Sequence, residues 1–200
     1  ARVQAALHTL GITRPHLLGY SMGGRTALHL ATAAPTAFST LTLVGATAGL
    51  ADPAERAARR AWDREIAAEA RTLGPVDFAA RWAQVPLIRS QKRIPAPWGA
   101  LLRARRRGAQ VEGLARSMEG MGTGSMPSLW ARLDTLQMPA LITVGEHDSK
   151  YRLIAPRMVA EMSRAQLGII EGAGHAAHLE APTRFAGLWR PWLDEVSPRC

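Results

Sequence analysis

The sequence predicts an α/β protein with a mostly parallel sheet and helices on both faces of that sheet. Short apolar runs alternate with stretches of helical periodicity in the first and last parts of the chain. A serine stands between glycines where the first apolar run gives way to a helix-prone stretch, and acidic or histidine-bearing loops follow two later apolar runs. Polar groups just beyond the carboxyl ends of buried strands are typical of parallel α/β sheets.

The first fifty residues predict a short helix, two strands and a helix between those strands. Residues 1–10 have helical spacing and end at Gly11, and an apolar strand follows at 16–18. A helix-prone stretch covers residues 25–31, and a β-rich run at 40–45 ends in glycine. This alternation agrees with a parallel sheet.

The middle of the chain predicts a helical insertion between two strands of the sheet. From residue 52 to about 120, Ala, Arg and Glu dominate and helical spacing replaces the apolar runs, while Pro86, Pro95 and Pro97 divide the stretch into pieces. We therefore expect a first core part at 1–51, a helical lid insertion at 52–124 and a second core part at 125–200.

The last part of the chain returns to the alternation of strands and helices. Residues 139–145 predict a buried strand, and residues 166–170 predict another strand. A helix near residue 130 carries Trp130 and Leu133 on one face. The last helix has core-facing spacing of its large apolar residues, which are Phe185, Leu188, Trp189 and Trp192.

Residues 19–23, Gly-Tyr-Ser-Met-Gly, have the G-x-S-x-G pattern of a nucleophile elbow. Gly19 and Gly23 let the incoming strand and the outgoing helix approach closely, and the strained turn exposes the Ser21 hydroxyl. The backbone N–H of Met22 points the same way and can donate to a developing oxyanion. The pattern predicts Ser21 as an activated catalytic hydroxyl.

An activated serine needs a histidine base and an acid that orients it, and this fold supplies them downstream in the order acid, then histidine. Asp148 follows the strand at 139–145, and His175 follows the strand at 166–170. Because both loops lie beyond the carboxyl ends of parallel strands, we expect Ser21, Asp148 and His175 to converge at one edge.

Other titratable residues near these positions are weaker candidates. Glu146 is the alternative acid, because it follows the same strand as Asp148. His178 begins a helix, so we expect it to be structural or to support the site from behind. His8, His16 and His29 show no pattern of partners, and we assign them no role.

Composition limits the possible classes of protein. No apolar run approaches the about 18 residues that a membrane helix needs, so we predict no membrane span and no membrane partner. The only cysteine is Cys200, which excludes a disulfide or a thiolate metal site within the chain. That cysteine usage agrees with the reducing cytoplasm, where we place the protein.

The positive charge is concentrated in the helical insertion. The formal net charge is +9, and residues 51–110 hold 13 Arg and Lys against 6 Asp and Glu. The arginine cluster at 103–107 has no interleaved aromatics and no accompanying nucleic-acid motif, so we predict no nucleic-acid partner. Two interpretations remain, a solvated helix face or a binding site for a small polyanion, whose carboxylates match guanidinium forks.

Ser21 stands unusually early for an elbow. In this architecture strands normally precede the elbow, and the loop of one of them gives the second oxyanion N–H. Residues 1–15 contain no strand pattern that could do so, and the chain starts with Ala rather than Met. We therefore expect an N-terminally truncated form of the fold, either a fragment or a shortened gene product.

Several segments together resemble a known family. They are Gly19–Arg25, Glu55–Asp63, Arg81–Leu87, Gly113–Ala115, Gly122–Trp130, Gly145–Tyr151 and Gly172–His175. Over its whole length the chain resembles the α/β-hydrolase superfamily, and more closely the 2-succinyl-6-hydroxy-2,4-cyclohexadiene-1-carboxylate synthases of menaquinone biosynthesis. The Gly122–Trp130 segment and Arg25 discriminate best, whereas Met126 replaces a more usual glutamine and Met118-Glu119 a Leu-Arg pair.

The resemblance implies a substrate and a set of binding residues. The substrate would be a small polycarboxylate, held by Arg25, Arg59 and Arg106 with Tyr20 and Trp82 alongside. Arg106 is assigned by counting along the sequence, and the neighbouring Arg105 or Arg107 could take its place. The activated serine would remove a proton from the substrate and pyruvate would leave, without a metal or cofactor.

Two other functions compete with this one. An ordinary serine hydrolase, such as an esterase or a C–C bond hydrolase, would use the same triad, and only the anion-binding arginines distinguish it. The other is an inactive truncated paralogue, which the early elbow favours. Nothing in the sequence indicates an oligomeric state.

Overall fold

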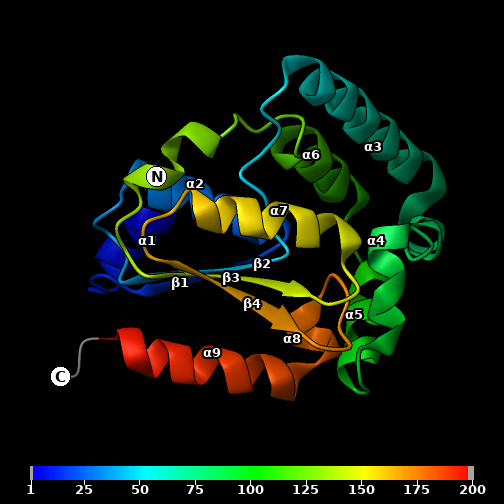
Figure 1. Cartoon of the computed structure of the whole chain (residues 1–200). Helices are drawn as coiled ribbons and strands as arrows, with labels where there is room; N and C mark the ends of the chain where they lie inside the picture. The colour runs from blue at the N-terminus through cyan, green and yellow to red at the C-terminus, as the bar shows by residue number, and fades with distance from the viewer. Residues whose placement is uncertain (1, 198–200) are drawn as a thin grey trace.

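The computed structural model describes residues 2–197 and contains a four-stranded sheet with helices on both faces (Figure 1). The single cysteine, Cys200, lies outside the described residues. The strands lie side by side in chain order and are β1 (His16–Tyr20), β2 (Thr40–Val44), β3 (Ala140–Gly145) and β4 (Ala165–Ile170). All three pairings are parallel, which confirms the predicted sheet.

The register of the sheet brings the carboxyl ends of its strands together. Tyr20 pairs with Val44, Val44 with Thr143, and Gly145 with Ile170. Strands β2 and β3 are buried along their whole length. This explains why both are continuous apolar runs in the sequence, because a parallel strand covered on both faces has no solvent side.

Helices cover the two faces of the sheet. In Figure 1, α2 (Met22–Ala33) and α7 (Ser149–Ala160) lie above the sheet, and α9 (Pro182–Val196) lies below it. The short helix α8 (Ala177–Glu180) lies near the carboxyl end of β4. Helix α1 (Arg2–Thr9) precedes the first strand. The larger core cluster fills the α2 and α7 side and includes Leu28, Leu43, Ile142 and Met158.

The aromatic residues of the last helix pack as predicted. Phe185 and Trp192 are buried, and Leu188 and Trp189 are half-buried against the second core cluster, on the α9 side of the sheet. Trp130 and Leu133 lie in the 3-10 helix η2 (Trp130–Thr135) rather than in an α-helix. Leu133 is fully buried there.

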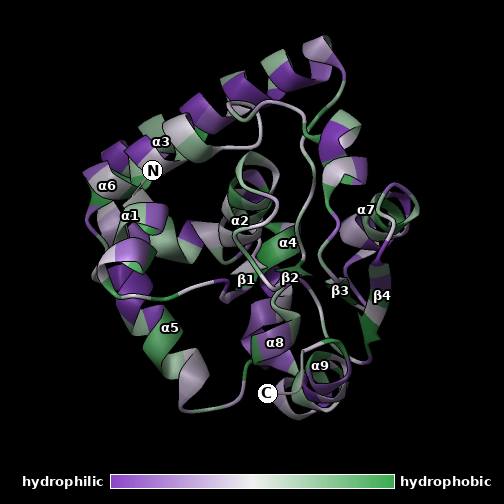
Figure 2. Ribbon diagram, turned by 90° about the vertical axis from the view of Figure 1, so that its left-hand side faces the viewer, coloured by the Kyte–Doolittle hydropathy of each residue, from purple (hydrophilic) through white to green (hydrophobic). Residues whose placement is uncertain are grey.

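The chain between β2 and β3 is helical, and we call residues 52–124 the lid segment. Its elements are α3 (Pro53–Trp82), α4 (Pro86–Arg89), the 3-10 helix η1 (Ser90–Arg93), α5 (Trp98–Arg107) and α6 (Val111–Met121). The purple colour of much of α3 in Figure 2 marks its hydrophilic side chains. Figure 1 shows these helices gathered beyond the carboxyl ends of the strands.

The expected prolines do delimit the short lid helices, but sequence reasoning missed one break. Helix α4 begins at Pro86, and Pro97 is the residue before α5. Inside α3, Gly74 has φ 72° and ψ 175°, and Pro75 follows it, so α3 is two helices joined at a kink. Glycine reaches that left-handed φ without the penalty of a side chain, and proline cannot continue the hydrogen-bond ladder.

Candidate active site

Ser21 lies at a sharp turn between β1 and α2. Its φ of 49° and ψ of −110° are strained for a residue with a side chain. The Ser21 N–H donates to the Val44 carbonyl at 2.8 Å, and the Arg25 N–H donates to the Ser21 carbonyl at 3.0 Å. The first helical hydrogen bond therefore closes at Arg25, so the Met22 N–H lies in the first turn of α2, where amides lack helical partners.

Glycines make this turn possible. A Cβ on Gly19 would lie 2.5 Å from the Gly23 carbonyl oxygen, and one on Gly24 would lie 2.6 Å from the Ala46 Cβ. No side chain fits at either position. Helix α2 therefore packs directly against β1, and Ser21 is held at the carboxyl edge of the sheet.

The three predicted catalytic side chains lie in one row. The Ser21 Oγ is 2.9 Å from His175 Nε2, and His175 Nδ1 is 2.7 Å from Asp148 Oδ2. The side chains of His175 and Asp148 are each 1% exposed. The other carboxylate oxygen, Asp148 Oδ1, accepts a hydrogen bond from the Tyr151 N–H at 3.3 Å, so both oxygens of Asp148 are held. This geometry suits a serine activated by an oriented imidazole.

Glu146, the alternative acid, does not face His175. Its Oε2 accepts from the Gly172 N–H at 2.8 Å, and its side chain is 44% exposed. That backbone hydrogen bond lowers the pKa of Glu146. Glu146 thus fixes the turn after β4 and lies apart from the row.

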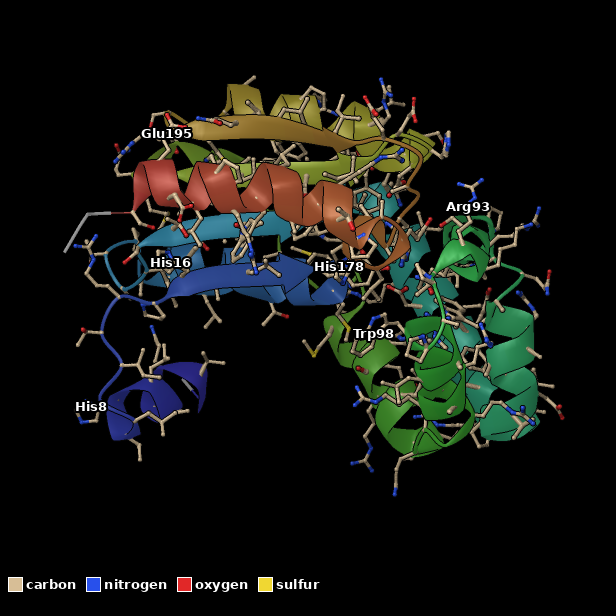
Figure 3. All side chains as sticks on the ribbon, turned by 90° about the horizontal axis from the view of Figure 1, so that it is seen from below. His8, His16, Arg93, Trp98, His178 and Glu195 are labelled. Atoms are coloured by element: carbon tan, nitrogen blue, oxygen red, sulfur yellow. The ribbon has the colours of Figure 1, made fainter. Side chains whose placement is uncertain are left out.

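His178 packs behind the site. Its ring lies 4.7 Å from the Tyr20 ring, and Figure 3 shows it at the carboxyl end of β1, whereas His8 and His16 lie toward the other end. Burial lowers the pKa of His178, and the nearby His175 lowers it further. A neutral His178 agrees with the predicted supporting role.

A cavity of about 440 Å³ opens over the serine, between the core and the lid segment. Ser21, Met22 and His175 line its floor, and apolar lid side chains such as Ile66, Trp82 and Leu114 line its walls. Trp82 stacks on Phe78 with their ring centroids 5.7 Å apart. The predicted residue Trp82 therefore forms a rigid apolar wall of the cavity.

Three cationic side chains line the same cavity. They are Arg25, Arg59 and Lys150, with Asp63 as the carboxylate among the lining residues. Arg59 Nε donates to Asp63 Oδ1 at 2.8 Å, so that carboxylate is already paired. Arg25 donates to the Met121 carbonyl at 2.5 Å and approaches the Met126 sulfur at 3.8 Å.

The electrostatics of these cations favour an anionic ligand. Burial lowers the pKa of Arg25, and burial followed by the positive charge of Arg59 lowers that of Lys150. Both shifts show that burial disfavours the charged forms of these side chains, a cost that a bound carboxylate would offset. Lys150 was missed as a binding residue by sequence reasoning, although it stands only two positions after Asp148.

Arg106 and Tyr20 lie beside the cavity and are not among its lining residues. Arg106 donates to Gln91 Oε1 at 2.5 Å, and Gln91 Nε2 donates to the Tyr20 hydroxyl at 3.0 Å. The Tyr20 ring lies 5.3 Å from the His175 ring. Burial raises the pKa of Tyr20, so its hydroxyl stays protonated. Sequence reasoning missed the bridging residue, Gln91, which is 7% exposed.

Residues 2–197 contain neither a cluster of metal-ligating side chains nor a membrane span. No three His, Cys, Asp or Glu side chains gather there in a way that could hold a metal ion. No helix in that range is both long and apolar enough to cross a membrane.

Comparison with known proteins places the chain in a family. The alpha/beta hydrolase family model matches residues 1–188. A Bacillus subtilis protein provisionally named 2-succinyl-6-hydroxy-2,4-cyclohexadiene-1-carboxylate synthase is 35% identical over 94% of this chain and 68% of its own length. The synthase of that name from Serratia proteamaculans is 31% identical over 96% of this chain and 73% of its own.

A solved structure agrees with the sequence comparison. The structure of MenH from S. aureus superposes with a TM-score of 0.91 at 30% identity, over 97% of this chain and 73% of that one. The residues that the family model matches, 1–188, include the turn at Ser21, the lid segment and the loops that carry Asp148 and His175. The chain belongs to the alpha/beta hydrolase family, among relatives that are named 2-succinyl-6-hydroxy-2,4-cyclohexadiene-1-carboxylate synthases.

Proposed function

We propose that this protein is a carbon–oxygen lyase of menaquinone biosynthesis. It would eliminate pyruvate from 2-succinyl-5-enolpyruvyl-6-hydroxy-3-cyclohexene-1-carboxylate to give 2-succinyl-6-hydroxy-2,4-cyclohexadiene-1-carboxylate. The observation that carries the proposal is that Arg25, Arg59 and Lys150 line the cavity onto which Ser21 and His175 open. A site for a neutral ester does not need three cations, whereas a site for a substrate with several carboxylates does.

The reaction begins with a proton transfer within the triad. His175 Nε2 takes the proton of the Ser21 hydroxyl, and Asp148 stabilises the imidazolium through Nδ1. The serine oxygen then removes the ring proton alpha to the succinyl ketone, so it acts as a base and forms no acyl bond.

The electrons of that C–H bond drive the elimination. They form the new double bond between C2 and C3, the existing C3–C4 double bond moves to C4–C5, and the C5–O bond breaks. The leaving enolate of pyruvate takes the proton held on His175 and tautomerises to pyruvate. The proton that the serine oxygen took from the ring restores its hydroxyl. Ser21 and His175 end in their starting protonation states, so the atoms and charges balance.

Negative charge develops on the ketone oxygen during proton removal. The Met22 N–H at the start of α2 is the donor that we assign to it, supported by the positive end of the helix dipole. One such donor contributes roughly 10²–10³ in rate in comparable sites.

The remaining site residues would hold the substrate in place. Arg25, Arg59 and Lys150 bind its carboxylates, and Trp82 packs on its ring. Tyr20 and Arg106 act from the edge of the cavity through Gln91. Arg106 would thus contribute by orienting Tyr20 and by its positive charge.

The test is direct detection of pyruvate. Purified protein is incubated with the enolpyruvyl substrate, and pyruvate is measured by coupling to lactate dehydrogenase, with Ser21→Ala as the matched control. The proposal requires serine-dependent pyruvate release. Rapid hydrolysis of p-nitrophenyl esters with no pyruvate formed would instead establish the second candidate, a serine hydrolase, which the same triad favours.

A further inference from the structure

The backbone on both sides of His175 is held by two side chains outside the catalytic row. Glu180 Oε2 accepts from the Gly174 N–H at 2.8 Å, and Glu180 Oε1 accepts from the Ala176 N–H at 3.1 Å. The N–H of His175 itself donates to the Ser90 Oγ at 3.3 Å. The amides of residues 174–176, which we call the histidine loop, therefore all have side-chain acceptors.

The two acceptors are joined to each other. The Ser90 hydroxyl donates to Glu180 Oε1 at 2.8 Å. Its proton therefore goes to the carboxylate, and its oxygen is left free to accept from the His175 N–H. One carboxylate and one hydroxyl thus form a closed network around the loop, in which each polar group has a complementary partner.

Ser90 belongs to the lid segment, whereas Glu180 and His175 belong to the core. Ser90 begins η1, and η1 packs against α8, which ends at Glu180. The fit is tight, because a Cβ on Gly174 would collide with the Cβ and Oγ of Ser90. The histidine loop reaches its full set of hydrogen bonds only while the lid segment is in place.

We propose that Ser90 and Glu180 are positioning residues for His175, and that through them the lid segment completes the catalytic row as well as roofing the cavity. Two sets of contacts then fix the position of His175. Asp148 fixes its ring through Nδ1, and the Ser90–Glu180 pair fixes its backbone. A lid segment that moves away removes the second contact and misaligns Nε2 with the Ser21 hydroxyl.

Ser90 and Glu180 act at a distance from the substrate. Neither is among the residues that line the cavity over Ser21. Ser90 lines a second cavity, of about 240 Å³, with Asp148, Lys150 and His175. Their loss should therefore lower the rate of the chemical step and leave the KM for substrate nearly unchanged.

The experiment measures serine activation without using the natural substrate. A fluorophosphonate inactivates a serine at a rate that depends on its histidine, so the inactivation rate constant reports the alignment of Ser21 with His175. Ser90→Ala should lower this constant about 10-fold, because it removes a hydrogen bond to a charged group. Glu180→Gln should lower it more, since the amide group presents a donor to backbone N–H groups. Because the assay measures inactivation by a fluorophosphonate, it tests this proposal independently of whether the protein releases pyruvate.

Matched controls separate positioning from general damage. Ser125→Ala removes another half-buried hydroxyl, which bonds to the Glu119 carbonyl at the end of the lid segment, and Glu171→Gln removes an exposed carboxylate near the histidine loop. Both should keep the wild-type rate. The double variant Ser90→Ala/Glu180→Gln should be no slower than Glu180→Gln alone, because the two groups form one network.

A second signal tests the same idea in the resting protein. The Nδ1 proton between His175 and Asp148 should give a low-field proton NMR resonance, which broadens or shifts in Ser90→Ala. The proposal is overturned if Ser90→Ala and Glu180→Gln keep the wild-type inactivation rate, or if Ser125→Ala loses as much. If Ser90→Ala does not fold, the inactivation rate of Glu180→Gln alone tests the proposal. Circular dichroism then checks that Glu180→Gln is folded to the same extent as the wild type.

Discussion

Gly45 and His175 are packed so closely that a Cβ on Gly45 would lie 3.0 Å from both Cε1 and Nδ1 of the imidazole ring. Gly45 follows β2 and has φ 55°, in the left-handed region that favours glycine. The glycine therefore allows both the turn after β2 and the position of the histidine ring. The structure gives this glycine a role that its sequence context, the end of an apolar run, does not reveal.

Replacing that glycine should disable the site. We expect Gly45→Ala to lower kcat by at least about 10-fold, because the methyl group displaces the ring that orients Ser21, and to cost about 1–2 kcal/mol of stability from backbone strain. Steady-state kinetics and thermal unfolding measure the two effects. Gly187→Ala is the control, since a Cβ there meets nothing within 4 Å and alanine favours its helix. Wild-type kcat in Gly45→Ala would contradict the prediction.

The identity of the catalytic acid can be tested by two conservative substitutions. Ser21→Ala or His175→Ala should lower turnover by at least about 10³, and Asp148→Asn should also be severe because it favours the wrong histidine tautomer. Glu146→Gln should be mild, since that carboxylate accepts from the Gly172 N–H and does not face His175. The assignment of Asp148 is wrong if Glu146→Gln is the more damaging of the two acid variants.

The cations of the cavity should contribute to substrate affinity. We expect Arg25→Gln, Arg59→Gln and Lys150→Gln each to weaken binding of the polycarboxylate by about 1.5–3 kcal/mol, the range for hydrogen bonds to charged groups. The measurement is KM for pyruvate release together with the affinity of the product. Arg93→Gln, an exposed lid arginine, serves as the control. Unchanged affinity in all three cavity variants would refute a polyanionic substrate.

The Gln91 bridge predicts that Arg106 acts indirectly. Gln91→Leu should cost about 1–3 kcal/mol of stability, because it leaves the Tyr20 hydroxyl and the Arg106 guanidinium without their bridging partner. Arg106→Gln should raise KM less than Arg25→Gln does, since Arg106 does not line the cavity. A larger effect at Arg106 than at Arg25 would place Arg106 in direct contact with the substrate.

An exposed ion network joins two lid helices and should respond to acid. Arg71 on α3 contacts Glu112 and Glu119 on α6, each at 2.7–2.8 Å. The Arg71 hydrogen bonds, followed by one from Arg116, lower the pKa of Glu112 from 4.5 to about 2. A carboxylate whose folded pKa is lowered stabilises the fold above its unfolded pKa, and this stabilisation disappears as the pH falls from 4.5 toward 2.

The measurement is thermal unfolding of the wild type and of Glu112→Gln at several pH values. The difference in Tm should be largest near neutral pH, shrink below about pH 4.5 and decrease in high salt. Glu161→Gln, an exposed carboxylate outside the lid segment, controls for the loss of one negative charge. A Tm difference between the two proteins that grows as the pH falls would contradict the predicted direction of the pH dependence.

Local patterns in the sequence were enough to determine the strands and the order of the catalytic motifs. Buried strands are continuous apolar runs because they have no solvent-facing side that could carry polar residues. A nucleophile elbow requires glycines at fixed positions, and the sequence shows these directly. Parallel strands also bring their carboxyl ends to one edge by topology alone. For that reason the sequence by itself groups Ser21 with Asp148 and His175, although the serine stands far from the other two along the chain.

The sequence predicts a helical lid segment, but which of its side chains face the cavity was decided only by the tertiary structure. Its helices are amphipathic and rich in arginine, and helical periodicity alone does not say which of those arginines faces the cavity. The structure places Arg59 of the lid segment there, together with Arg25 of α2 and Lys150 of α7. It leaves Arg106 outside, with Gln91 between it and Tyr20. Likewise, Ser90 meets the histidine loop only through the packing of η1 on α8. Such contacts depend on the angle at which one helix packs on another, and no short stretch of sequence specifies that angle.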